Sequence, residues 1–119
     1  MTVTFVELHA FARVRREYFV DDAHFREFQN ALLYDPHLGA VIPGAGGIRK
    51  VRWPDPRRGK GKRGGLRVLY RAYAEAAIIL LLAVYDKSIE DLTTEQREAL
   101  ARSAEQFEAE LARLAEQRS

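Results

Sequence analysis

The chain has 119 residues, 47% of them apolar, and a formal net charge of +2. This length supports one hydrophobic core and is too short for two domains of usual size, so we expect a single domain over residues 1–119. Cysteine is absent, which excludes disulfides, thiolate metal sites and cysteine catalysis. The start lacks a signal-peptide pattern, and the longest apolar run is about half the length of a bilayer-spanning helix. We therefore expect a cytoplasmic protein with no membrane association.

The charges are unevenly distributed along the chain. Ten basic residues and one acid lie between Arg49 and Arg71, which gives this segment a net charge of +9. From Ser88 to the end, eight acids face four arginines, for a net charge of −4. A basic middle segment of this kind favours an anionic partner such as nucleic acid.

The first third of the chain predicts a strand followed by two helices. Residues Thr2–Leu8 are β-branched and aromatic enough for a strand. Asp21 or Asp22 can cap the second helix, which must end near Asp35 because Pro36 follows. Apolar residues repeat at helical spacing in both helices: Phe11, Val14 and Tyr18, then Phe25, Phe28 and Leu32. The two helices form a hairpin that needs a sheet to pack on.

The glycine-rich segment Gly39–Gly47 lacks the ending of a phosphate-binding loop and is predicted to be a turn. The next strand, Ile48–Trp53, has Arg49, Val51 and Trp53 on one face and Ile48, Lys50 and Arg52 on the other. We expect Trp53 in the core. Residues Pro54–Gly65 are rich in glycine, proline and basic residues, which predicts an exposed, mobile loop.

The second half predicts two strands and a long helix. Residues Leu66–Tyr73 alternate like a strand, and Ala77–Tyr85 is apolar throughout, as in a central strand covered on both faces, although a buried helix has the same pattern. Thr93 and Gln96 form a capping box before an amphipathic helix over residues 93–119. The predicted fold is therefore α+β: an N-terminal strand, a helical hairpin, a three-stranded antiparallel meander completing one sheet, and a long C-terminal helix.

Histidines are few and scattered. His9, His24 and His37 have no metal-ligand spacing and none lies in the basic region, so we predict neither a metal site nor a histidine base. Acid–base chemistry must then fall to Lys, Arg or Tyr. If the central strand continues, Tyr85 and Lys87 point to the same face.

Three segments carry a family resemblance: GGIRKVRW, GKGKRGGLRVLY and LAVYDKSIEDLTTEQ. Together they are similar to the HigB branch of the RelE/ParE toxin superfamily, over about Phe5 to Leu100. The resemblance implies a RelE-like fold and a ribosome-dependent endoribonuclease that cuts messenger RNA by attack of the 2′-hydroxyl, without metal or cofactor. It also implies an antitoxin partner, often a helix-turn-helix protein in this branch.

The resemblance also assigns residues. The implied catalytic residues lie on the strands and after the last one: Lys50, Arg52, Arg67, Tyr85 and Lys87. We predict that the basic residues in and beside the loop bind RNA or the ribosome: Arg57, Arg58, Lys60, Lys62, Arg63 and Arg71. Of these, Lys60, Lys62 and Arg63 match the basic loop of the family, where the resemblance implies RNA binding or catalysis equally.

Each assignment has an alternative. Alternate strand charges are commonly a solvated face, Arg67 and Arg71 could pair with acids of the C-terminal helix, and Tyr85 could be an ordinary strand-end aromatic. Two other functions stay open: a ParE-like toxin that inhibits DNA gyrase without chemistry, and a plain nucleic-acid-binding module. The role of the C-terminal helix and the oligomeric state also stay open.

Overall fold

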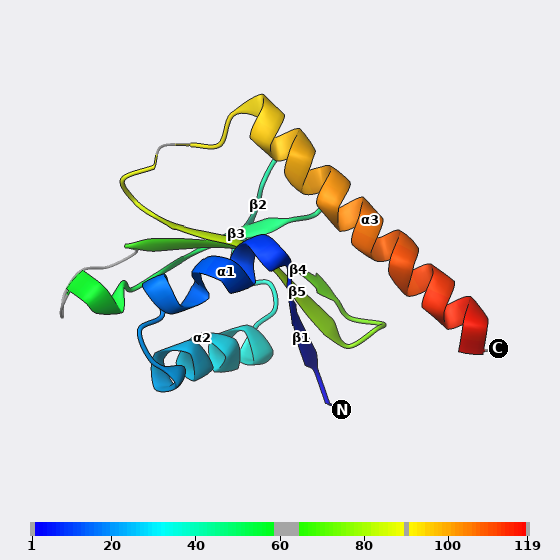
Figure 1. The fold of residues 1–119 in the computed structure, drawn as a ribbon, viewed down its shortest axis with the longest axis horizontal. Helices are drawn as coiled ribbons and strands as arrows, with labels where there is room; N and C mark the ends of the chain where they lie inside the picture. Colours follow the sequence, from blue (N-terminus) through cyan, green and yellow to red (C-terminus); the bar gives the residue numbers. More distant parts are fainter. Residues whose placement is uncertain (1, 59–64, 90, 119) are drawn as a thin grey trace.

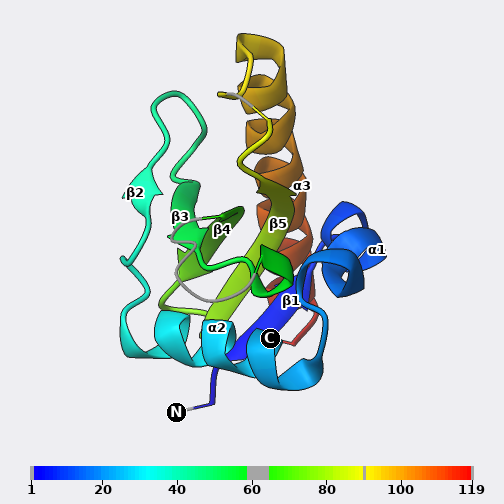
Figure 2. The ribbon, with the colours of Figure 1, turned by 90° about the vertical axis from the view of Figure 1, so that its left-hand side faces the viewer.

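One mixed β-sheet lies between a helical hairpin and a long C-terminal helix in the computed structural model, which describes residues 2–58, 65–89 and 91–118 (Figure 1). The sheet order is β1-β5-β4-β3-β2, with β1 parallel to β5 and every other pair antiparallel (Figure 2). The predicted α+β fold is confirmed. In chain order the elements are β1 (Thr4–Glu7), α1 (His9–Tyr18), α2 (Asp22–Tyr34), β2 (Ala40–Val41), β3 (Arg49–Trp53), a 3₁₀ helix (Pro56–Arg58), β4 (Leu66–Tyr73), β5 (Ile78–Asp86) and α3 (Thr94–Arg118).

The helical hairpin covers one face of the sheet. Asp21 caps α2 through a bond from the backbone N–H of His24 to Oδ1 (2.9 Å), as the capping prediction requires. The predicted apolar stripes point inward, and Phe28 is fully buried in a T-shaped contact with the Trp53 ring, with 5.3 Å between the ring centroids. Trp53 therefore belongs to this core, as predicted.

The C-terminal helix α3 packs on the opposite face of the sheet. The capping box is present, because the N–H of Thr93 donates to Gln96 Oε1 (2.9 Å) and the N–H of Gln96 donates to Thr93 Oγ1 (3.1 Å). Leu100, Ala104 and Phe107 join the second core, whereas Leu114, near the end of the predicted stripe, is 45% exposed. The packing of α3 in this core thus extends to Phe107. Within the described residues, no helix has the length and apolarity that crossing a membrane requires.

A polar clamp adds to this packing of α3. The Tyr73 hydroxyl donates to Glu108 Oε2 (2.7 Å), and Arg71 Nε lies 3.8 Å from the same oxygen. Burial, together with the bond to Glu108, raises the pKa of Tyr73 above its ordinary value. The phenol therefore stays protonated and keeps donating to α3 at neutral pH.

Two sequence predictions need correction. The segment Gly39–Gly47 is more than a turn, because Ala40 and Val41 form the edge strand β2 against Lys50 and Arg49. A two-residue strand is too short to show an alternating pattern. The turn that follows does use glycine, with Gly44, Gly46 and Gly47 at positive φ.

The segment Pro54–Gly65 is not exposed throughout. Asp55 is buried, and its carboxylate is paired with the Arg57 guanidinium, with Nη2–Oδ2 at 2.7 Å and Nε–Oδ1 at 2.9 Å. Gly65 packs directly on it: a Cβ at Gly65 would lie 2.7 Å from the Asp55 Cβ. The two ends of the segment Pro54–Gly65 are therefore in direct contact. Residues 59–64, the rest of the predicted loop, lie outside the described part of the chain.

Candidate functional site

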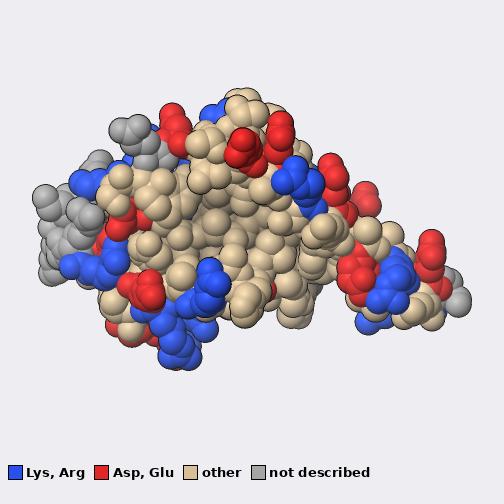
Figure 3. All heavy atoms as spheres, turned by 45° about the horizontal axis from the view of Figure 1, so that its top comes forward, with Lys and Arg blue, Asp and Glu red and all other residues tan. Residues whose placement is uncertain are grey.

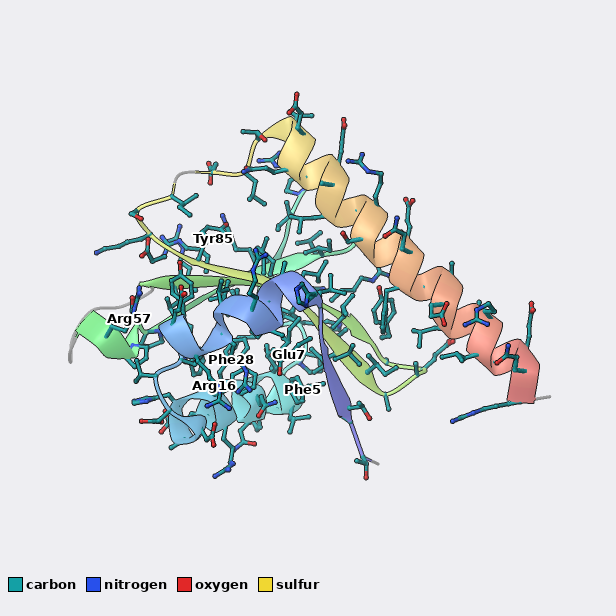
Figure 4. The ribbon with its side chains drawn as sticks, in the orientation of Figure 1. Phe5, Glu7, Arg16, Phe28, Arg57 and Tyr85 are labelled. Carbon is teal, nitrogen blue, oxygen red and sulfur yellow. The ribbon has the colours of Figure 1, made fainter. Side chains whose placement is uncertain are left out.

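A β-bulge in β5 decides which side chains share the site. Tyr85 pairs with Arg67 and Ala83 with Leu69, but the next pair is Leu81 with Tyr70, so Leu82 is an extra residue. Leu82 and Ala83 consequently both belong to the core under α3. Without the extra residue, strict alternation would place Tyr85 on the face of Leu81, under the helical hairpin. The bulge instead places Tyr85 on the α3 face, while Phe28 lies on the hairpin side (Figure 4).

The ladder then aligns the predicted catalytic residues. Arg52 pairs with Arg67 and Arg67 pairs with Tyr85, so three adjacent strands contribute one row of side chains. Directly opposed residues have Cβ atoms about 4.5–5.5 Å apart, which allows joint contact with one phosphate. Lys50 lies two residues before Arg52 and shares its face. The N–H of Lys87 donates to Gly65 O (2.9 Å) and extends the ladder past the end of β5.

One surface pocket, with a volume of about 430 Å³, is lined by all five predicted catalytic residues. Arg52 and Lys87 are exposed, whereas Lys50, Arg67 and Tyr85 are half-buried. The remaining described lining residues are Ile89 and Asp91, from the segment between β5 and α3. Among the described lining residues, four cationic side chains face one carboxylate, which makes this pocket, hereafter the cationic pocket, suitable for a phosphate group.

The Tyr85 side chain that lines the cationic pocket is a protonated phenol. Its side chain is half-buried, and this burial raises the pKa of the hydroxyl, an effect that the Arg67 charge opposes and the Asp91 charge reinforces. At neutral pH the hydroxyl is therefore available to donate a hydrogen bond or a proton. Removal of that proton by water requires alkaline solution.

Asp91 was not predicted from the sequence, in which no spacing or motif marks it. Its carboxylate Oδ1 lies 3.7 Å from Lys50 Nζ, and the Asp91 side chain is 86% exposed. A bound phosphate would compete with this carboxylate for the Lys50 ammonium. Asp91 thus lowers the positive potential of the free pocket.

Asp91→Asn is expected to strengthen phosphate binding in the cationic pocket by about two- to fivefold at low salt, because exposed ion pairs are weak and screened. The measurement is the Kd for inorganic phosphate at low and high ionic strength, with the gain shrinking as salt rises. Glu105→Gln, at an exposed position of α3 outside the pocket lining, serves as the control. Equal gains in both variants would show a general charge effect and no role for the Lys50 contact.

Of the predicted RNA-binding residues, Arg57 and Arg71 are absent from the described lining of the cationic pocket. Arg57 is held by Asp55, reaches Asp86 Oδ2 (3.3 Å) and stacks over the Tyr18 ring at 4.6 Å, which makes it an anchor for the base of the loop. Arg58 ends the 3₁₀ helix. Lys60, Lys62 and Arg63 lie outside the described residues. RNA binding by these loop residues stays a prediction.

Arg71 lies farther along β4 than Arg67, under α3. Its guanidinium donates to Gly46 O, approaches Glu108 and lies 4.9 Å over the Tyr73 ring. It is absent from the described lining of the cationic pocket. Pairing with an acid of α3, the alternative considered for Arg71, is therefore observed, and RNA binding by Arg71 stays a prediction.

Charged side chains surround an uncharged recess on this side of the molecule (Figure 3). Lys and Arg side chains are numerous toward one end, with some acids among them, and both signs of charge accompany α3. In the described residues, His, Asp and Glu form no group of three that could hold a metal ion.

Comparison with known proteins finds a similar fold among solved structures. No protein-family model matches the chain. Among solved structures, the chain is similar to the isolated RelE toxin of E. coli, with a TM-score of 0.50 and 16% sequence identity. The match covers 85% of this chain and 98% of that one. At this identity the similarity establishes a RelE-like fold.

Proposed function

We propose that the chain is a toxin of a type II toxin–antitoxin system, similar to the HigB branch, that cuts messenger RNA on the ribosome. The observation that carries this proposal is the cationic pocket, in which Lys50, Arg52, Arg67, Tyr85 and Lys87 meet on one face of a RelE-like sheet. The resemblance in sequence assigned roles to these five residues independently of their position in space. A solvated strand face would not require them to line one concave surface.

The pocket contains the groups that metal-free RNA cleavage needs. The 2′-oxygen attacks phosphorus and forms the cyclic phosphate, while the bond to the 5′-oxygen breaks. The 2′-proton passes to a base, a role that we assign to Lys50 or Lys87, and the leaving 5′-oxygen gains a proton, for which Tyr85 is the protonated donor. Arg52 and Arg67, opposed on adjacent strands, stabilise the charge that develops on the phosphoryl oxygens.

The open shape of the cationic pocket supports dependence on the ribosome. It is an open surface hollow, so another body must hold the message in line for attack, and alignment alone supplies a large part of such a rate. We propose the ribosome as that body. We also propose a cytoplasmic location and an antitoxin whose contacting surface is acidic or apolar, since this surface of the toxin is cationic.

The experiment is cleavage of a translated message by the purified protein, compared with the same RNA without ribosomes. Lys50→Ala and Arg52→Ala should abolish cleavage, whereas Arg102→Ala, at an exposed position on α3, should cut at the wild-type rate. Cleavage that survives in both pocket variants would contradict the assigned site. Growth arrest without RNA cleavage would place the protein with the gyrase-inhibiting toxins, and RNA binding without either effect would indicate a plain binding module.

Ribosome binding is expected to depend on the basic loop, because clustered cations release counterions from RNA phosphates. Replacing Lys60, Lys62 and Arg63 together with alanine should weaken binding to ribosomes and reduce the slope of log K against log salt by roughly two to three. The matched control removes three cations of the helical hairpin, Arg13, Arg16 and Arg26, which are exposed. An unchanged affinity in the loop variant, or an equal loss in the control, would show that the loop is not the main contact.

A further inference from the structure

A second hollow, hereafter the side groove, adjoins the cationic pocket. It lies between β5 and the start of α3 and has a volume of about 280 Å³. Tyr85 lines both hollows, so the two lie next to each other at this side chain.

The side groove differs from the cationic pocket in chemistry. Its walls are largely apolar, from Ala83 on β5 and from Leu92, Ala99 and Leu100. None of its described lining residues is charged. The side chain of Ala99 is small and projects little from the helix, so a flat ring can approach the helix backbone at this point.

Two polar side chains of α3 also line the side groove: Gln96 and Ser103. The Gln96 Oε1 atom is already occupied by the backbone N–H of Thr93 (2.9 Å), which leaves the amide NH₂ as the donor of this side chain. The Ser103 hydroxyl can donate or accept. An apolar slot with a few polar groups is the usual composition of a site for a small planar ligand.

We propose that the side groove binds the nucleobase next to the phosphate held in the cationic pocket. A nucleotide is complementary to the two hollows. Its anionic phosphate fits the cationic pocket, and its flat base with polar edges fits the adjoining apolar groove. The assignment rests on the proposed ribonuclease activity, because that activity brings an RNA phosphate to Lys50 and Arg67. The side groove would then contribute to the choice of cleavage position through the base beside the cut.

The test compares ligands with and without a base on the wild-type protein. The probes are the four nucleoside 5′-monophosphates and ribose 5-phosphate, which lacks only the base, with Kd values measured by NMR titration. The base should improve affinity about tenfold for at least one of the four, as expected for a base on an apolar platform.

Ala99→Phe fills the side groove at an exposed helix position, so the fold should tolerate it. It should reduce the gain from the base to twofold or less and leave the Kd for ribose 5-phosphate unchanged. The matched control, Ala112→Phe, is exposed on the same helix outside the described groove lining and should behave like the wild type. Lys50→Ala should weaken binding of every probe, because it acts on the phosphate.

The outcomes separate the two proposals. If the wild-type protein binds ribose 5-phosphate but gains nothing from a base, the base subsite is wrong and the phosphate site stands. A gain that persists in Ala99→Phe would also overturn the subsite, and loss of antitoxin binding in that variant would then assign the groove to a protein partner. If the wild-type protein binds no phosphate probe, the cationic pocket and the subsite both fail.

Discussion

Arg67→Ala is expected to reduce RNA cleavage by more than about a hundredfold, which corresponds to a loss on the order of 3 kcal/mol of transition-state stabilisation. Arg67 is the middle member of the row that Arg52, Arg67 and Tyr85 form across three strands. Its position on a paired strand preorganises the guanidinium toward a phosphate in the pocket. Arg67→Lys should recover only part of the activity, because lysine lacks the planar fork of donors.

The measurement is the rate of cleavage of a translated message, for a variant that has been shown to melt cooperatively and to bind its antitoxin. Arg26→Ala, exposed on α2 of the hairpin, removes the same charge and should leave the rate unchanged. A wild-type rate in folded Arg67→Ala would exclude this arginine from the reaction.

Phe28→Ala is expected to lower the free energy of unfolding by about 3–5 kcal/mol, the usual cost of removing a fully buried aromatic ring. The Phe28 ring contacts Phe19, Phe25 and Trp53, and so joins the helical hairpin to β3. Small domains have total stabilities of about 5–15 kcal/mol, so the loss is a large fraction of the whole.

Chemical denaturation measures this loss as a lower midpoint with an unchanged slope. Leu33→Ala serves as the control on the same helix, because Leu33 is 45% exposed and its truncation should cost within about 0.5 kcal/mol. Equal losses in the two variants would mean that the hairpin does not pack on the sheet through Phe28.

Local sequence patterns were enough to predict most of the elements. The Asp21 cap, the Thr93–Gln96 box and the alternation in β4 all depend on neighbouring residues, and each is present. Strand β2 was missed because its two residues are held by pairing with β3, which the local sequence does not encode. The burial of Asp55 was missed for a similar reason, since it depends on contact with Gly65, ten residues farther along the chain.

The composition of the site was predicted, but the reason for its geometry was not. All five catalytic candidates line one pocket, yet Tyr85 reaches it only because Leu82 is an extra residue in β5. A run of apolar residues looks the same with or without a bulge. Asp91 and the side groove depend on how the segment before α3 folds back over the sheet, which is a matter of tertiary packing.

The ribonuclease function is tested most directly by mapping the 5′ ends of cellular messages after induced expression of the chain, with translation active and with initiation blocked. The proposed function predicts new ends within translated reading frames, their disappearance when initiation is blocked, and their absence when Arg67→Ala is expressed. Growth arrest with unchanged message ends, or cleavage that persists without translation, would contradict a ribosome-dependent ribonuclease.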